Sequence, residues 1–439
     1  MRYEMRHEMQ WKRLWRLWWK LRWKLCREIK GVCNLYSLLW TFLLSLKPIK
    51  MANFSEGKFM NIRFLGLCVS IVGYVALPFF TVHAEPLGLP PVPIPAGNPQ
   101  TPEKIKLGEK LFNDQRFSST GKISCATCHK VSKAFTDSPL RTSEGIGKLT
   151  GTRNAPTVVN AAYMSKLFWD GRSRDLEDQS QHPFLNPVEM GLKNHEPILK
   201  IVRTDPQYRD SFKAVFNKSD EQIPIKEVTQ AIASFERTII SGDSPFDRWR
   251  YGNDKTAMSP SQIRGFEVFV GQGRCVSCHV VEQTQALFTD NRFHNIGIGI
   301  NSVQQDVPRL AGEFLKAKAQ GTDVDVAVLT DKKVSELGRF AVTDEFDVIG
   351  AFKTSTLRNI AATAPYMHDG SLKTLKDVVI HYDNGGITKK TDRVNDFLSG
   401  GIRPLDLSKK QISDLVAFME ALTSPEHVKA AKMAKKSKK

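Results

Sequence analysis

The sequence predicts a mainly α-helical protein built of two domains. Three observations indicate this: a cysteine-rich motif that occurs twice, apolar residues at helical spacing around both copies, and a break rich in Gly, Ser, Asp and Pro at residues 241–260. At 439 residues the chain is long enough for two hydrophobic cores. We expect the first domain at residues 101–245 and the second at residues 246–425.

The repeated motif is Cys-x-x-Cys-His. Its members are Cys125, Cys128 and His129 and, 150 residues later, Cys275, Cys278 and His279. Two thiols at this spacing can form thioethers with the two vinyl groups of a haem, and the adjacent histidine can ligate the iron. The sequence therefore predicts two covalently bound haem c groups, one in each of two cytochrome c-like helical domains.

A structural zinc site or a redox dithiol is the alternative explanation of paired cysteines. The other three cysteines, Cys26, Cys33 and Cys68, all precede residue 85, so no thiol near the motifs is left for a resolving partner. A zinc site does not need a histidine directly after both pairs, and a thioredoxin-like site expects a βαβ pattern that is missing here. Cysteine usage therefore favours haem.

The formal net charge of +17 lies mostly at the two ends of the chain. Residues 1–84 carry 14 Lys and Arg against 4 acidic residues, and the last eleven residues add six Lys. The body between them is near neutral and has no basic stripe interleaved with aromatic residues. The charge therefore does not indicate a nucleic-acid partner.

Residues 1–84 are interpreted as a spurious or extended N-terminus followed by a signal peptide. Met51 or Met60 is a sensible start, because an apolar run at 64–80 and a small-residue cleavage site at 82–84 follow. We expect export to the periplasm. The alternative is that the segment stays uncleaved as an anchor, and only then is contact with a membrane expected.

Apolar spacing predicts helices around both motifs. We expect a helix at 101–112 and another at 408–422 that opens with a capping box of Ser408 and Gln411. Further helices are indicated by two apolar sets: Val228, Ile232, Phe235 and Ile239, and Ile263, Phe266, Phe269 and Val270. Residues 85–100 are expected to form a Pro-rich leader, 135–152 a loop over a haem face, and 426–439 a Lys-rich tail.

A dense polar and aromatic segment lies between the two motifs. It contains Trp169, Asp170, Arg172, Gln179 and Glu189. A purely structural interpretation is available, with Trp169 in the core, Asp170 and Arg172 as a local ion pair, and Glu189 as a helix cap. The segment by itself therefore defines no active site.

The chain resembles the bacterial di-haem cytochrome c peroxidases and their relative MauG, which oxidises a protein substrate. The resemblance spans about residues 100–425 and rests on the two Cys-x-x-Cys-His motifs, Arg153-Asn154-Ala155-Pro156, Phe168-Trp169-Asp170-Gly171-Arg172, Gln179, Glu189, Leu357-Arg358-Asn359 and residues 364–370. It implies an enzyme that reduces hydrogen peroxide at an open N-terminal haem and relays electrons or oxidising equivalents through the C-terminal haem.

The resemblance also implies roles for individual residues. Trp169 would lie between the haems, and Gln179 and Glu189 would lie on the open face of the N-terminal haem. Glu189 suits a proton shuttle during cleavage of the O–O bond, and Gln179 would orient the peroxide. A calcium site between the domains is implied as well, with oxygen ligands from Asn154, Thr363 and Pro365.

Two positions depart from the pattern of the classical peroxidases. Where those enzymes place a loop histidine that caps the N-terminal haem, this chain has Ile146, which cannot ligate iron, so we expect that haem to be open at rest. The far ligand of the other haem is a methionine in the classical enzymes and a tyrosine in MauG. The matching position holds Tyr382, with His381 or Met367 as the alternative ligand. Both departures favour the MauG-like branch.

We therefore expect a di-haem peroxidase that takes electrons from a small periplasmic cytochrome c or cupredoxin. The first alternative is a MauG-like enzyme that oxidises a partner protein, although Gly273 replaces the tryptophan that MauG uses to pass oxidising equivalents to its substrate. The second alternative is a di-haem electron carrier without turnover. Ile146 disfavours the carrier, because a carrier needs both irons six-coordinate.

Overall fold

The computed structural model describes residues 86–218, 222–387 and 395–436, and the expected signal peptide lies outside them. Helices dominate this part of the chain, as predicted. The α-helices are α4 (Pro102–Asn113), α5 (Cys125–Cys128), α6 (Leu176–Gln179), α7 (His182–Leu185), α8 (Glu196–Thr204), α9 (Pro206–Phe216), α10 (Ile225–Glu236), α11 (Pro245–Arg250), α12 (Pro260–Val270), α13 (Val307–Ala319), α14 (Val324–Thr330), α15 (Lys332–Ser335), α16 (Phe340–Thr343), α17 (Leu375–Asp383), α18 (Lys409–Glu420) and α19 (Val428–Lys436).

Strands are almost absent from the described residues. Only β1 (Phe293–His294) and β2 (Phe352–Lys353) occur there, and they pair antiparallel. None of the helices in the described ranges combines the length and the apolarity that crossing a bilayer requires.

Each Cys-x-x-Cys-His motif follows a helix that crosses a later helix at a glycine. The helix α4 packs on α10 at Gly108, where an added Cβ would overlap the backbone carbonyl of Ala231. The helix α12 packs on α18 at Gly265, where an added Cβ would overlap the backbone carbonyl of Asp414. Only glycine permits such close crossings, so the same device supports both motifs.

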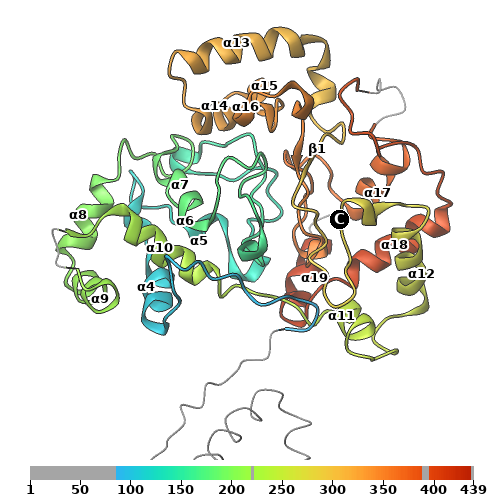
Figure 1. Ribbon diagram of the computed structural model, residues 1–439, viewed down its shortest axis with the longest axis horizontal. Helices are drawn as coiled ribbons and strands as arrows, with labels where there is room; N and C mark the ends of the chain where they lie inside the picture. Colours follow the sequence, from blue (N-terminus) through green and yellow to red (C-terminus); the bar gives the residue numbers. More distant parts are fainter. Residues whose placement is uncertain (1–85, 219–221, 388–394, 437–439) are drawn as a thin grey trace, which may run out of the picture. The chain divides into compact units, whose positions relative to one another are not determined.

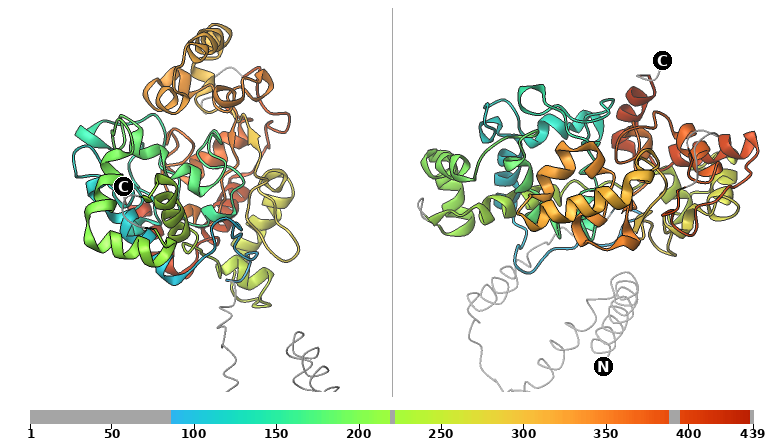
Figure 2. Two further views of the ribbon diagram at one scale, coloured as in Figure 1. Left: turned by 60° about the vertical axis from the view of Figure 1, so that its left-hand side comes forward. Right: turned by 90° about the horizontal axis from the view of Figure 1, so that it is seen from above.

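Three large hydrophobic clusters hold the described chain together. One lies within residues 107–239, the second within 246–422 and the third within 300–349. Figure 1 shows α4 to α10, in blue and green, on one side, and α11, α12, α17 and α18, in yellow and red, on the other. The orange helices α13 to α16 carry the third cluster at one edge of both groups (Figure 1; Figure 2).

The predicted helix ends agree closely with the structure, with one correction. Ser408 caps α18 in a capping box with Gln411, as expected. The helix α10 ends at Glu236, so Ile239, which the apolar spacing assigned to that helix, lies beyond it. The chain turns there, with the Ile239 N–H donating to the Glu236 carbonyl, and Ile239 still enters the first cluster.

The Lys-rich C-terminal segment contains α19, which is packed against the rest of the chain. Its Ala430 is buried with Ala134 and Ala362 in a small cluster of alanines.

The Pro-rich leader ties the two helix groups together without forming a helix. The Tyr163 hydroxyl donates to the Pro90 carbonyl at 3.0 Å, and Arg358 donates to the Gly88 carbonyl at 2.6 Å. Arg358 is also paired with the fully buried Asp247 at 2.8 Å. Gly88 has a positive φ of 84°, and an added Cβ would overlap Asp247. Glycine is therefore required at this point of the leader.

Candidate active site

The first motif occupies the short helix α5 and the residue after it. Ser124 opens the helix in a capping box with Thr127, and the backbone N–H of Ser124 donates to the Thr127 hydroxyl at 3.0 Å. The Nδ1 atom of His129 lies 3.0 Å from the Phe135 carbonyl oxygen. This contact fixes the ring and leaves Nε2 as the nitrogen for an iron.

The second motif repeats this arrangement with a different local backbone. Arg274 adopts a left-handed conformation ahead of a single 3-10 turn at Cys275–Ser277. The Nδ1 atom of His279 lies 2.8 Å from the Phe288 carbonyl oxygen. Cys275, Cys278 and His279 line a cavity of about 580 Å³.

Tyr382 lines the same cavity from α17. Thr374 caps that helix with Asp377, and Leu375, Val378 and Val379 reach the cavity from the same helix face. Burial raises the pKa of the Tyr382 phenol, and the nearby Cys275 and Cys278 thiols add to the rise. A ferric ion supplies the positive charge that a buried phenolate needs.

The two alternative ligands are placed differently. The Nε2 atom of the buried His381 lies 2.8 Å from the Ile296 carbonyl oxygen, whereas Met367 lines the cavity together with Tyr382. The assignment of Tyr382 as the iron ligand stays a prediction.

Glu189 lies beside the first motif with a buried carboxyl oxygen. Its Oε2 has no hydrogen-bond partner. Burial raises the pKa of Glu189 to about 7, with the Asp325 carboxylate adding to the rise and Arg172 opposing it. Burial raises the pKa of both Cys125 and Cys128, and Glu189 contributes to each rise. The acid therefore interacts electrostatically with both sulfurs of the first motif, and its pKa suits proton exchange near neutral pH.

The loop that carries Ile146 lies directly against Glu189. The Ile146 N–H donates to the Glu189 carbonyl at 2.9 Å, and the Ile146 side chain lies against Gly191. An added Cβ on Gly145 would overlap the backbone of Val188 and Glu189, which explains why glycine stands there. Gln179, the second polar residue expected here, ends α6 and is half-buried.

Trp169 lines the cavity of the second motif and is fixed by the backbone around it. Its indole Nε1 donates to the Asn154 carbonyl at 2.8 Å, and its own carbonyl accepts from the Lys353 N–H at 2.7 Å. The neighbouring Asp170 is fully buried and pairs with Arg172 at 3.0 Å, which is the local ion pair that the structural interpretation of this segment expects.

The residues expected to bind calcium all line the same cavity as Trp169. They are Asn154, Thr363 and Pro365. The Asn154 side-chain N–H₂ donates to the Arg141 carbonyl at 3.0 Å. Because the amide nitrogen is used in this way, the amide oxygen is the atom left for a hard cation.

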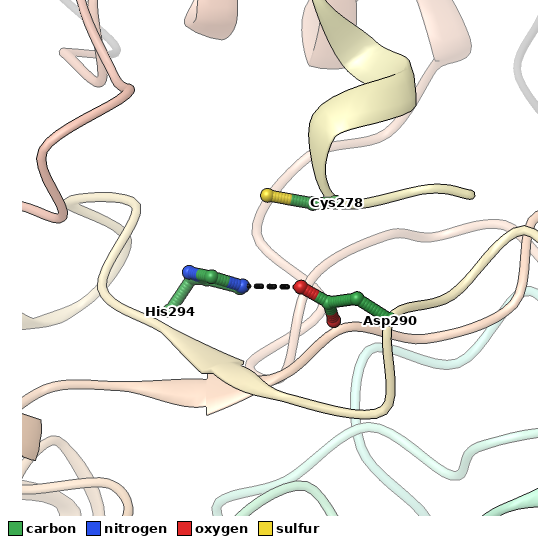
Figure 3. Close-up of side chains that lie close together, drawn as sticks. All are labelled: Cys278, Asp290 and His294. Atoms are coloured by element: carbon green, nitrogen blue, oxygen red, sulfur yellow. Dashed lines mark hydrogen bonds and ion pairs between the residues drawn. The ribbon is translucent and has the colours of Figure 1, made fainter.

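The structure also brings together a group that the sequence did not reveal. The side chains of Cys278, Asp290 and His294 place their ligand atoms within 4.8 Å of one another (Figure 3). His294 Nε2 lies 2.7 Å from the Asp290 carboxylate. A thioether at Cys278 removes the thiolate that a metal would need, so we assign this trio to the surroundings of the second haem. No spacing rule links residue 278 to 294.

Both motifs fit a covalent haem. Each histidine has its Nδ1 held by a backbone carbonyl, and the second motif opens into a cavity with mostly apolar walls. The fold and these sites define a c-type haem protein with two attachment sites, one of which adjoins a buried acid.

Comparison with known proteins gives the family. A model of the di-haem cytochrome c peroxidases matches residues 102–255. The chain is 37% identical to the methylamine utilization protein MauG of Methylorubrum extorquens over 331 residues, or 75% of this chain and 81% of that protein. It is 34% identical to the cytochrome c551 peroxidase of Nitrosomonas europaea over 331 residues, or 75% of this chain and 83% of that protein. The chain belongs to the di-haem cytochrome c peroxidase family, and it is therefore an oxidoreductase with covalently bound haem c.

Solved structures agree on the fold. A MauG-like protein associated with microbial copper homeostasis matches with a TM-score of 0.63 at 30% identity, over 78% of this chain and 95% of that chain. The di-haem peroxidase BthA of Burkholderia thailandensis matches with a TM-score of 0.58 at 22% identity, over 75% of this chain and 88% of that chain. The mainly α-helical architecture predicted from the sequence is confirmed.

Proposed function

We propose that this peroxidase reduces hydrogen peroxide at the haem of the first motif, held by Cys125, Cys128 and His129. The observation that carries the proposal is the buried, unpartnered carboxyl oxygen of Glu189 beside that motif. When bound, the haem iron supplies an open coordination position for the peroxide and the electrons that cleave its O–O bond.

The chain itself supplies the proton handling. Glu189 accepts the proton from one oxygen of the peroxide and returns it to the other oxygen, which leaves as water. A carboxyl with a pKa near 7 performs both steps without a large energetic penalty. Gln179 orients the peroxide by hydrogen bonding, and Ile146 leaves the iron accessible because its side chain is an alkyl group.

The second haem is proposed to relay electrons or oxidising equivalents. Its residues are Cys275, Cys278, His279 and Tyr382, and Trp169 connects the two centres. A phenolate from Tyr382 favours ferric over ferrous iron, which suits a site that shares oxidising equivalents rather than one that stores electrons. We assign one haem to each of the two helix groups, at residues 101–245 and 246–425.

Rapid mixing of the resting enzyme with peroxide tests the proposal. We expect fast loss of high-spin ferric absorbance in the wild type and a slow reaction in Glu189→Gln. A pure electron carrier would show no fast reaction in either protein, and that result would overturn the proposal.

Oxidation of a partner protein is a second candidate. Tyr382 in the cavity favours it, because a tyrosine ligand is what the resemblance to MauG implies. Gly273 disfavours a long route to a docked substrate. Incubation with peroxide and proteins from neighbouring genes, followed by mass spectrometry, would reveal new covalent modification. Turnover with only a small cytochrome c or cupredoxin as reductant would exclude this function.

Two further assignments complete the proposal. Asn154, Thr363 and Pro365 bind a calcium ion, and its removal by a chelator should change the spectra of the haems. The mature enzyme works in the periplasm, which cell fractionation would test directly.

A further inference from the structure

Asp325 reaches the first haem site from a distant part of the chain. It lies in the first turn of α14, in the helix group built around the third hydrophobic cluster. Its carboxylate accepts from the Arg172 Nε at 2.7 Å and from the Asn186 side chain at 2.8 Å. The side chain is almost fully buried, so these contacts are made away from bulk water.

The side-chain hydrogen bonds of Arg172 run from Nε and Nη1 to partners other than Glu189. Its Nη1 donates to both oxygens of Asp170 at 3.0 Å, and its guanidinium lies 3.6 Å from the centre of the Phe168 ring. Two carboxylates thus share one guanidinium, and Glu189 Oε2 receives no hydrogen bond from it. The planar guanidinium has little freedom to turn toward a third carboxylate while both aspartates hold it.

Two charged side chains in the described part of the chain act on Glu189. Asp325 and Arg172 act on it most strongly after burial itself, with opposite signs. His182 lies 3.8 Å from Asp325, and the buried Arg153 lies 3.9 Å from Asp170. Glu189 also acts electrostatically on the sulfurs of Cys125 and Cys128 in α5, and these sulfurs carry no charge once they are thioethers.

We propose that Asp325 is a positioning residue for the peroxidase reaction: it holds Arg172 away from Glu189, so that the Glu189 carboxyl stays free to take up and release a proton. This inference rests on the function proposed above. A helix from the second half of the chain thereby sets the proton chemistry of the first haem site.

The sign of the effect follows from the charges. A negative Asp325 makes ionisation of Glu189 harder and raises its pKa. Replacing Asp325 by Asn removes that charge and frees Arg172 to approach Glu189, and both changes lower the pKa. Because the ionised carboxylate takes the first proton, the reaction with peroxide should accelerate as pH rises through this pKa.

The test is the pH profile of the reaction with peroxide in the haem-loaded enzyme. Asp325→Asn should move the rising limb down by about one pH unit, and Asp325→Glu should return it toward the wild-type position. Asp331→Asn is the control, because Asp331 caps the neighbouring α15 and does not touch Arg172. Infrared spectroscopy provides a second readout: the protonated carboxyl band that Glu189→Gln removes should disappear at lower pH in Asp325→Asn.

The outcomes separate the two proposals. An unchanged rate and profile in Glu189→Gln would overturn the proposed function. A slow Glu189→Gln enzyme together with an unshifted profile and band in a folded Asp325→Asn enzyme would overturn only the role of Asp325. A shift of equal size in Asp331→Asn would also overturn it, since loosening of the helix group would then explain the effect.

Discussion

Gly108 and Gly265 each permit a close helix crossing, one in each half of the molecule (residues 101–245 and 246–425). The groups around the two neighbouring Cys-x-x-Cys-His motifs nevertheless differ in chemistry. In each half a glycine lets the helix before the motif press against a carbonyl of a later helix, and a backbone carbonyl holds the histidine. The first half adds acids that burial makes harder to ionise. Burial raises the pKa of Glu189 to about 7 and that of Glu236 to about 8.

The second half contains a cluster of aromatic rings around Phe246. Phe246 contacts Phe288 at 5.3 Å and Phe418 at 5.6 Å between ring centres, and Tyr382 is the polar group offered to the cavity from α17. The comparison indicates that the crossed helices position the two Cys-x-x-Cys-His motifs. The groups that line each site then decide whether protons are handled there.

The largest effect is expected from removing the acid that distinguishes the first half. Glu189→Gln should slow the reaction with peroxide by roughly 10² to 10⁴-fold while leaving the spectrum of the second haem intact. Stopped-flow absorbance measures both. Glu196→Gln is the control, because Glu196 lies exposed on α8. Equal rates in the two variants would remove the proposed distinction between the halves.

The role of the two glycines at the helix crossings can be tested by adding a side chain at each position. Gly108→Val and Gly265→Val should each lower the free energy of unfolding by about 2 kcal/mol, because an added side chain forces the paired helices apart. Chemical denaturation followed by circular dichroism measures the loss. Gly312→Ala is the control, since nothing lies within 4 Å of an added Cβ there. If only one crossing proves sensitive, the two halves are not equivalent.

Replacing Tyr382, the predicted far ligand of the second haem, should affect the second half of the molecule alone. Tyr382→Phe should abolish phenolate-to-iron absorption and change the rate of the first reaction with peroxide by less than about tenfold. Met367→Leu is the matched variant, because both side chains line the cavity. A spectrum altered by Met367→Leu and untouched by Tyr382→Phe would assign the ligand to Met367.

The smallest effects are expected at the helix caps. Thr101 accepts from the Lys104 N–H at 3.2 Å and Ser408 from the Gln411 N–H at 3.2 Å. Thr101→Ala and Ser408→Ala should each lower the free energy of unfolding by about 1 kcal/mol. Thermal unfolding compares them with Ser132→Ala, at an exposed position. A larger loss for Ser408 is expected, because Gln411 also bonds back to the cap.

Much of the fold was predictable because its signals are local. The Cys-x-x-Cys-His spacing, the capping box at Ser408 and the apolar face of α17 each lie within a few residues of sequence. The end of α10 was predicted too late, because Ile239 continues the apolar spacing although the helix has already turned.

Contacts between residues far apart in the sequence could not be predicted from such local signals. Asp325 meets Arg172 across 153 residues, and His294 approaches Cys278 although no motif links the two positions. In both cases tertiary packing, rather than a spacing in the sequence, puts the charges together. The residues that tune a site are therefore harder to find from sequence than those that attach its cofactor.

The contacts of Gly88 and Pro90 limit how far the N-terminus of the chain can be shortened. The carbonyl of Gly88 completes the buried pairing of Arg358 with Asp247, and the N–H of Leu87 donates to Asp243 at 2.8 Å. Proteolytic cleavage after these positions would remove the carbonyl that accepts a hydrogen bond from the buried Arg358 guanidinium. The leader would then no longer link the two halves of the enzyme. A chain that begins after Gly88 is therefore expected to lose both of these contacts.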